Sequence, residues 1–397
     1  MPGASGPRVA FVVPRYGPGV VGGAETLCRL MAENLAAHGT PVEVLTTCAV
    51  DHFTWANHHP EGATVEGGVT VRRFAVSAER DPERFWALHT AIDAGAPVGY
   101  SEEVEWMGQS VWSAGLQAAA EDADRYDWAV GIPYLFGTGF WAAAARPERT
   151  ALIPCLHDEP HARTRIVVGA LTAARGLMLN SEGEGHLAER IAPGARRRVV
   201  GVGYDDEPPP SPDEVAAFCA RRGIASGYLL YAGRREAAKG LPLLFSHYAA
   251  LRRARPDTPP LALMGSGDLP VPDELAGHVI ELGFVPDAER AAAYAGAALL
   301  VHPSTLESLG MVMLEAWLAG TPALVNAGSP VLLAHCRASG GGLWFSDEAD
   351  FVEACGAMLD DPGLRAALAA GGAGYTRSTF SWPEVRRRFL DALEEWA

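Results

Sequence analysis

Lysine is nearly absent from this sequence of 397 residues, in which Lys239 is the only basic residue of the 32 that is not arginine. Acidic residues number 48, and the formal net charge is −16. Nucleic acids and anionic membranes both bind clustered basic side chains, so the excess of acidic residues argues against either partner. A compact ammonium kept at one position favours a point-charge role there, although composition drift could also leave a single lysine.

Long apolar runs and paired cysteines are missing as well. No run is long enough to span a bilayer, and the N-terminal MPGASGPR lacks an apolar signal core. A length beyond one hydrophobic core and 48% apolar residues predict a globular, soluble chain of two domains, and the missing signal core and unpaired cysteines predict the cytoplasm. Six scattered cysteines follow no CxxC or metal-ligand spacing and are expected to be buried thiols: Cys28, Cys48, Cys155, Cys219, Cys336 and Cys355.

The N-terminal pattern is typical of a doubly wound parallel sheet. An apolar strand at 8–13 leads through a glycine-rich turn at 14–23 into a helix at 24–39, and a second strand follows at 42–47. The sequence therefore predicts an α/β domain that begins with a strand, a helix and a strand.

The glycine-rich turn also contains a dinucleotide fingerprint. Gly17, Gly19 and Gly22 spell G-x-G-x-x-G. However, three residues separate the strand from the first glycine, Pro18 stiffens the loop, and no acid ends the second strand. A dehydrogenase is therefore the weaker interpretation of this turn.

Two segments of the N-terminal half are candidates for acceptor contacts. The polar loop at 47–68 contains Trp55 and His58, which suit a carbohydrate surface, although a loop tryptophan can equally cap the core. Probable helices follow at 80–122, and residues 77–130 contain eleven acids against three arginines. This acidic stretch is either a solvated face or a surface that favours a cationic or neutral acceptor over an anionic lipid headgroup.

Further buried strands are expected at 126–133, 150–156 and 176–180. The second of them ends in HDEPH, which begins at His157, and polar groups at the carboxyl edge of a parallel sheet lie where such sheets bind ligands. His157 and His161 with the intervening acids could bind a metal. Because a proline separates them and breaks any helix that would align them, a metal site is the weaker alternative.

A proline-rich acidic stretch at 205–214 is the best domain boundary in the chain. The strand YLLYAG follows it and ends in a turn that contains Arg234 and Lys239, before a helix at 241–254. Two cations and a helix N-terminus can converge on one anion there. The alternative is a solvated turn with two basic residues.

Residues 301–322 read VHPSTLESLGMVMLEAWLAGTP. A strand that ends near His302 passes through a polar loop with Glu307 into an apolar helix with Glu315. The helix N-terminus suits an anion, so a nearby carboxylate is expected to bind a neutral hydroxyl-bearing group attached to that anion, such as a sugar phosphate. Alternatively, Glu315 is satisfied by a neighbouring arginine and Glu307 is a solvated loop residue.

This segment resembles the E-x7-E signature of retaining glycosyltransferases of family 4, which have the GT-B fold. The resemblance implies that Glu307 binds donor-sugar hydroxyls, that Glu315 binds the nucleotide ribose, and that the intervening backbone faces the diphosphate and sugar. That backbone comprises Ser308, Leu309, Gly310 and Met311. The family usually has Phe where this chain has Leu309, which leaves the backbone role intact.

Other positions resemble the family's motifs. Arg234 and Lys239 match its diphosphate-binding GR…KG, His157 matches a histidine near the reacting sugar, and residues 203–205 match its interdomain linker. The resemblance further implies roles in acceptor or donor contacts for Gly22, Gly23 and Glu25, and in donor contacts for Gly265, Phe284 and Val285.

The predicted fold is α/β, of GT-B type, with two Rossmann-like domains and a cleft between them. The N-terminal domain (1–204, with a terminal helix at 378–397) would bind the acceptor, 205–213 would form the linker, and 214–377 would bind the nucleotide sugar. The predicted activity is a metal-independent, retaining hexosyltransferase (EC 2.4) that needs no cofactor. Its acceptor would be soluble, a saccharide or an aminosugar-containing compound. The alternatives are a nucleotide-sugar epimerase and a noncatalytic carbohydrate-binding protein.

Overall fold

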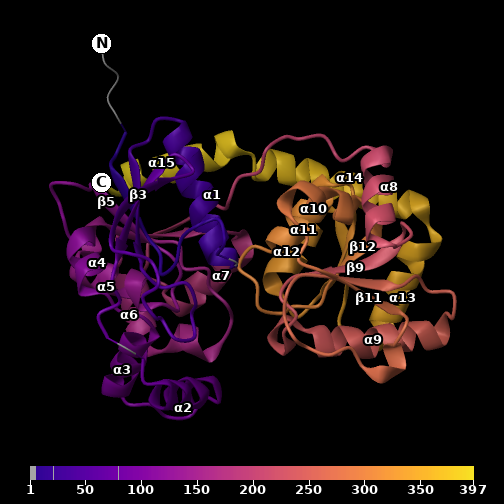
Figure 1. Cartoon of the computed structure of the whole chain (residues 1–397), viewed down its shortest axis with the longest axis horizontal. Helices are drawn as coiled ribbons and strands as arrows, with labels where there is room; N and C mark the ends of the chain where they lie inside the picture. Colours follow the sequence, from indigo (N-terminus) through magenta and orange to yellow (C-terminus); the bar gives the residue numbers. More distant parts are fainter. Residues whose placement is uncertain (1–5, 21, 79) are drawn as a thin grey trace. The chain divides into compact units, whose positions relative to one another are not determined.

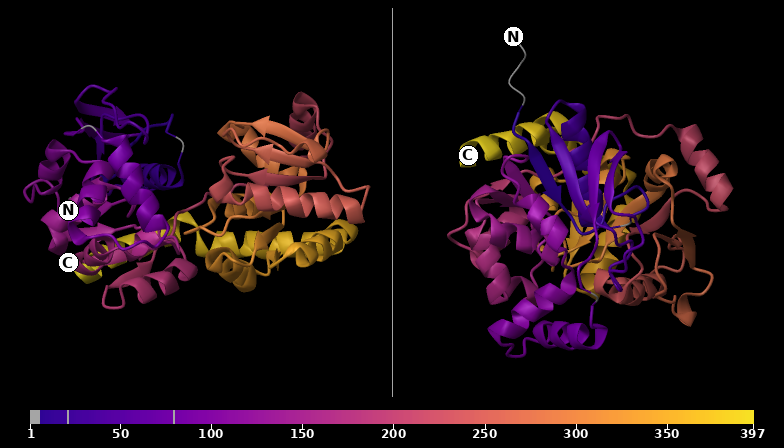
Figure 2. Two further views of the ribbon diagram at one scale, coloured as in Figure 1. Left: turned by 90° about the horizontal axis from the view of Figure 1, so that it is seen from below. Right: turned by 60° about the vertical axis from the view of Figure 1, so that its left-hand side comes forward.

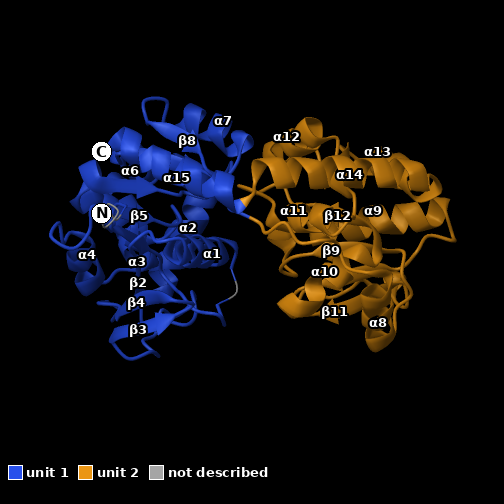
Figure 3. Cartoon of the chain, turned by 90° about the horizontal axis from the view of Figure 1, so that it is seen from above, with its two compact units in different colours: residues 1–203, 382–397 blue, residues 204–381 orange. Residues whose placement is uncertain are grey.

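The computed structural model describes residues 6–20, 22–78 and 80–397. It divides into two compact units, one formed by residues 1–203 and 382–397 and the other by residues 204–381 (Figure 3). Two predictions fall partly outside the described residues. The first five residues belong to the segment that lacks a signal core, and Glu79 belongs to the acidic stretch.

The first unit contains an eight-stranded sheet in the order β3-β4-β2-β1-β5-β6-β7-β8. Its central strand β1 pairs in parallel with both β2 and β5, so that Val12 lies opposite Leu45 and Gly131. The strands are β1 (Val9–Val12), β2 (Val42–Thr47), β3 (Gly62–Glu66), β4 (Val69–Phe74), β5 (Trp128–Gly131), β6 (Thr150–Leu152), β7 (Gly176–Leu179) and β8 (Arg197–Val199).

Helices flank the strands of this unit (Figures 1 and 2). They are α1 (Gly23–Ala37), α2 (Pro82–Asp93), α3 (Tyr100–Ser110), α4 (Ala114–Ala120), α5 (Gly137–Ala145), α6 (Arg165–Ala173), α7 (Glu182–Ile191) and the C-terminal α15 (Trp382–Trp396). Short 3-10 helices lie at η1 (Pro147–Arg149) and η2 (Pro160–Arg163).

The second unit contains a six-stranded parallel sheet in the order β11-β10-β9-β12-β13-β14. In chain order this is 3-2-1-4-5-6, and the direction of winding reverses between β9 and β12. Ligands of doubly wound sheets bind at the carboxyl ends of the strands at such a reversal. The strands are β9 (Tyr228–Ala232), β10 (Leu261–Met264), β11 (Val279–Gly283), β12 (Ala297–His302), β13 (Ala323–Asn326) and β14 (Gly342–Phe345).

Helices also flank this second sheet, whose strands β9 and β12 lie in the middle of the unit (Figure 1). They are α8 (Pro212–Arg222), α9 (Leu241–Ala254), α10 (Asp287–Ala295), α11 (Met311–Leu318), α12 (Pro330–Ser339), α13 (Glu348–Asp360) and α14 (Pro362–Thr379), with 3-10 helices η3 (Ala237–Lys239) and η4 (Asp273–Leu275). The prediction of two Rossmann-like α/β domains is confirmed. None of the helices among the described residues has the length and apolar character that a membrane span requires.

Candidate active site

The turns at the carboxyl edge of the second sheet pack backbone against backbone. A β-carbon on Gly265 would lie 2.0 Å from the carbonyl oxygen of Gly233, and one on Gly240 would lie 2.7 Å from that of Pro303. All three glycines have positive φ angles, which side chains rarely adopt. Glycine at these positions therefore lets the turns after β9, β10 and β12 close on one another at the winding reversal.

This close packing brings Lys239 and Glu307 together although 68 positions separate them. The Lys239 Nζ atom lies 2.8 Å from Glu307 Oε1, and the Glu307 side chain is only 14% exposed. Burial would raise the pKa of Glu307, but the charge of Lys239, together with His302 and hydrogen bonds, lowers it to about 2. Glu307 is therefore an ionised, paired carboxylate and not the solvated loop residue of the alternative interpretation.

Glu315, the second carboxylate of the E-x7-E segment, has different surroundings. It accepts a hydrogen bond of 2.8 Å from the Tyr294 hydroxyl and lies 3.6 Å from Arg290 Nε, both on α10. Burial raises the pKa of Glu315, and these two partners oppose the shift only in part. The neighbouring arginine expected by the structural alternative is thus present, and the side chain remains 20% exposed.

Helix α11 begins directly after Gly310, whose φ of 79° is in the left-handed region. A β-carbon there would lie 2.5 Å from the Leu332 side chain, so this position also requires glycine. Leu309 is buried at 3% exposure. Ser308 and Met311 flank these two residues at the start of the helix, whose first amides have no intrahelical partner. The predicted helix start is therefore present beside the Glu307 loop.

The other predicted donor residues lie on neighbouring turns. Arg234 follows β9, but its guanidinium is 47% exposed and pairs with Glu236 at 3.0 Å. Phe284 and Val285 follow β11; the Phe284 ring is 61% exposed, whereas Val285 is buried. These residues share one edge of the sheet with Lys239, and Phe284 presents an open aromatic face there.

In the first unit, Gly22 is the N-cap of α1 and Gly23 its first residue, so the helix begins one residue before the predicted start at 24. Glu25, in the first turn, is 6% exposed and accepts a hydrogen bond of 3.1 Å from Arg15 Nε. Its carboxylate is therefore already held by a buried cation, and its predicted acceptor role stays a prediction.

His157 lies beside the carboxylate of Glu159 in the first unit. Its Nδ1 atom lies 3.6 Å from Glu159 Oε1, and the same oxygen accepts a hydrogen bond from the Tyr134 hydroxyl. The imidazole is 27% exposed. His161, by contrast, is buried and stacks on the rings of His89 and Trp106. The structure thus separates the two histidines into one accessible residue and one core residue.

Trp55 does not present the surface expected for sugar stacking. It is 2% exposed, because its ring packs edge-on against Phe136 and lies under the Arg80 guanidinium. His58 is exposed on the same loop, and the open aromatic ring there is that of Phe53, at 61% exposure. Trp55 therefore covers the hydrophobic core, as the alternative interpretation of the loop proposed.

Sequence reasoning missed three groups around these residues. His302 lies beside Glu307, Tyr294 donates to Glu315, and Glu159 links Tyr134 with His157. The only sequence signal for the first was its place at the end of a buried strand. The other two come from helix and loop positions whose contacts depend on tertiary packing.

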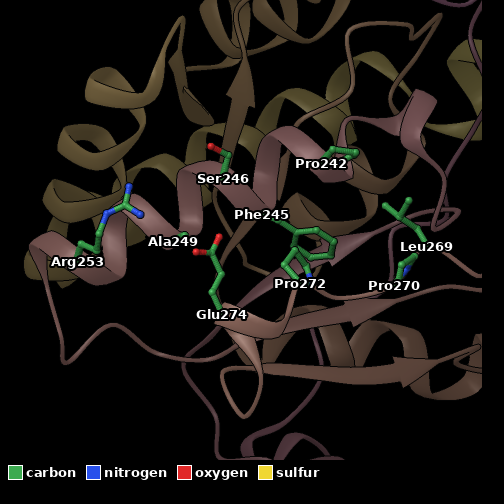
Figure 4. A pocket seen from close by; sticks show the side chains of 9 residues that line it. All are labelled: Pro242, Phe245, Ser246, Ala249, Arg253, Leu269, Pro270, Pro272 and Glu274. Carbon is green, nitrogen blue, oxygen red and sulfur yellow. The ribbon is translucent and has the colours of Figure 1, made fainter.

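A separate pocket of about 350 Å³ lies against α9 (Figure 4). Phe245, Leu269 and three prolines supply much of its lining, with Arg253 and Glu274 as its charged members. None of the predicted site residues lines it. Within the described part of the chain, no three His, Cys, Asp or Glu side chains are grouped so that they could hold a metal ion.

Comparison with known sequences finds a family match within the second unit. Residues 226–361 match the family described as Glycosyl transferases group 1. Across its full length the chain is 28% identical to D-inositol 3-phosphate glycosyltransferase of Xylanimonas cellulosilytica, of which 98% is covered. It is also 27% identical to glycogen synthase of Mycobacterium tuberculosis, over 95% of this chain and 92% of that one.

Solved structures share the fold. Sucrose-phosphate synthase of Thermosynechococcus elongatus superposes with a TM-score of 0.72 at 18% identity, over 98% of each chain. HepE of Anabaena, solved with UDP and glucose, gives a TM-score of 0.69 at 18% identity, over 98% of this chain and 99% of that one. The two α/β units are thus those of GT-B proteins.

Proposed function

We propose that this glycosyltransferase, which has the GT-B fold and a group 1 match in its second unit, moves a hexosyl group from a nucleoside diphosphate sugar to a hydroxyl of a soluble acceptor. The observation that carries the proposal is the contact of Lys239 with Glu307 at the winding reversal between β9 and β12. This contact supports the proposal, because a cation beside a carboxylate suits a ligand that has both a diphosphate and hydroxyl groups.

Each donor residue has a distinct role in this proposal. Lys239 and Arg234 neutralise the diphosphate, with the amides at the start of α11 as further donors. Glu307 accepts hydrogen bonds from the sugar, and Glu315 from the ribose. Phe284 lies beside the base, and uridine is the first base to test because the similar Anabaena protein was solved with UDP.

We propose that transfer retains the anomeric configuration. The bond between the sugar C1 and the diphosphate oxygen breaks, the acceptor oxygen bonds to C1 on the same face, and its proton passes to the departing diphosphate. His157 orients the sugar or the acceptor from the first unit. Since the cations that stabilise the leaving group are side chains, we expect the rate to persist in EDTA.

A transfer assay tests the proposal. Ligands are first chosen from UDP, GDP, ADP and dTDP by their effect on thermal stability, because a ligand of the folded state raises it. The matching nucleotide sugar is then incubated with candidate saccharides, including aminosugars, and the products are identified. A new glycoside with the donor's anomeric configuration is expected. A new nucleotide sugar formed from donor alone would instead show an epimerase, and no nucleotide binding would contradict the proposal.

A further inference from the structure

His302 is a buried histidine at the end of β12. Its side chain is 6% exposed, and neither ring nitrogen has a hydrogen-bond partner among the described residues. Buried polar groups in proteins are nearly always paired, since an unpaired one loses its bonds to water without replacement. An unpartnered imidazole at the winding reversal therefore requires an explanation.

The carboxylate of Glu307 lies near this imidazole. His302 Nε2 lies 4.0 Å from Glu307 Oε1, which is the oxygen that Lys239 Nζ contacts at 2.8 Å. The distance is too long for a hydrogen bond but would become one after a shift of about 1 Å. Burial lowers the pKa of His302, so the neutral ring can offer one N–H donor at neutral pH.

Without a ligand, Lys239 and Glu307 neutralise each other. The proposed function requires them to separate, because the ammonium has to meet the diphosphate while the carboxylate meets the sugar. A buried carboxylate that loses its cation is strongly destabilised unless another donor replaces it. Among the described neighbours, His302 is already close to the oxygen that would be released.

We propose that His302 is a positioning residue that donates a hydrogen bond to Glu307 when the diphosphate draws Lys239 away. The exchange keeps Glu307 oriented toward the sugar hydroxyls during the reaction. It makes binding of the sugar moiety, and not of the diphosphate, depend on His302. This inference rests on the proposed function of the same site.

Two substitutions separate this role from simple packing. His302→Phe keeps an aromatic ring without a hydrogen-bond donor, whereas His302→Gln keeps an amide N–H near the position of Nε2. For each variant, affinity is measured for the nucleoside diphosphate and for the intact nucleotide sugar without acceptor, together with kcat and KM. Unfolding temperatures verify that each variant is folded.

In His302→Phe, we expect diphosphate affinity within about twofold of the wild type, and affinity for the intact donor weaker by about tenfold with a lower kcat, as for one lost hydrogen bond to a charged group. His302→Gln should recover most of the loss. The inference would be overturned if the affinities for both ligands fell equally, or if the affinity for the intact donor did not change.

Nitrogen-15 NMR of the histidines tests the exchange directly in the wild type. The His302 signal, assigned by its absence in His302→Gln, should shift to a hydrogen-bonded position when the diphosphate is added. In Lys239→Ala it should already hold that position without ligand. A His302 chemical shift that does not change when the diphosphate is added contradicts the inference. A wild type that binds no nucleotide sugar contradicts the proposed function itself.

Discussion

Glu307 and Glu315 lie close in the sequence but in opposite electrostatic settings. Lys239 holds the pKa of Glu307 at about 2, whereas burial outweighs Arg290 and Tyr294 at Glu315 and raises its pKa. The first carboxylate is therefore fixed as an anion by a cation that, in the proposed function, the diphosphate draws away. The second is held by neighbours on α10 that have no such competing role in the proposed function.

The Glu307 pair should make stability depend on pH. Because its folded pKa is depressed from 4.5 to about 2, the ionised group contributes stability above pH 4.5 that is lost as the pH falls toward 2. We expect the free energy of unfolding of the wild type, minus that of Glu307→Gln, to fall by on the order of 3 kcal/mol over this range. Urea unfolding at several pH values measures it.

The control for this measurement is Glu353→Gln, which changes an exposed carboxylate on α13. Its difference from the wild type should stay within about 0.5 kcal/mol. A difference between wild type and Glu307→Gln that is the same at pH 6 and pH 2.5 would show that the pair does not stabilise the folded ion.

At the scale of elements, the start of α11 depends on Gly310. Its left-handed φ and the 2.5 Å approach to Leu332 both oppose a side chain. Gly310→Ala should lower the free energy of unfolding by about 1–2 kcal/mol and also weaken nucleotide binding, because the first amides of the helix would move. Urea unfolding and calorimetric titration with the diphosphate measure the two effects.

Gly374→Ala is the matched control, since Gly374 is exposed within α14 and has open space at its β-carbon position. Alanine there should stabilise the protein by about 0.5–1 kcal/mol and leave binding unchanged. A Gly310→Ala protein with the stability and affinity of the wild type would contradict the account of this helix start.

The strands of both sheets were largely predictable because buried parallel strands are short apolar runs. Strand β3 was not, since all but its last residue, Glu66, are exposed, and it pairs antiparallel with β4 at the sheet edge, where Arg73 also contacts Glu66. Its sequence GATVE has only two apolar residues, Ala63 and Val65, and both are exposed, so the pairing with β4 defines the strand. Trp55 was ambiguous for a similar reason, because its burial depends on Phe136, far away in the chain.

At the scale of the molecule, the C-terminal helix α15 belongs to the first unit, shown in blue in Figure 3. Phe389 is fully buried and stacks on Phe11 of β1 with ring centroids 5.8 Å apart. The first unit therefore needs the last residues of the chain to complete its core, whereas Lys239, Glu307 and Glu315 all lie in the second unit.

Phe389→Ala should destabilise the first unit by about 3–5 kcal/mol, as expected for a truncated core aromatic. In calorimetry we expect the transition of this unit to move to lower temperature, while the transition that a nucleoside diphosphate raises stays in place. Arg387→Ala, a change of an exposed side chain on the same helix, should leave both transitions unchanged. A shift of the nucleotide-sensitive transition in Phe389→Ala would contradict the assignment of α15.

The sequence allowed much of the candidate donor site to be proposed, because Glu307, Glu315, Lys239 and Gly310 lie in local patterns of strand, turn and helix. The contact between Lys239 and Glu307 was not predictable in detail, since it depends on the approach of Gly240 to Pro303. The place of His302 beside that pair depends on the same packing. Local pattern thus identified the residues, and tertiary packing determined their partners.

The central claim is that Lys239 binds the donor diphosphate. Calorimetric titration of the wild type, Lys239→Ala and Arg253→Ala with the nucleoside diphosphate tests it, since Arg253 is a cation of the same unit that lines the separate pocket (Figure 4). We expect Lys239→Ala to weaken binding by about 10- to 100-fold, and Arg253→Ala to leave it unchanged. Unchanged affinity in Lys239→Ala, or a loss in Arg253→Ala instead, would contradict the claim.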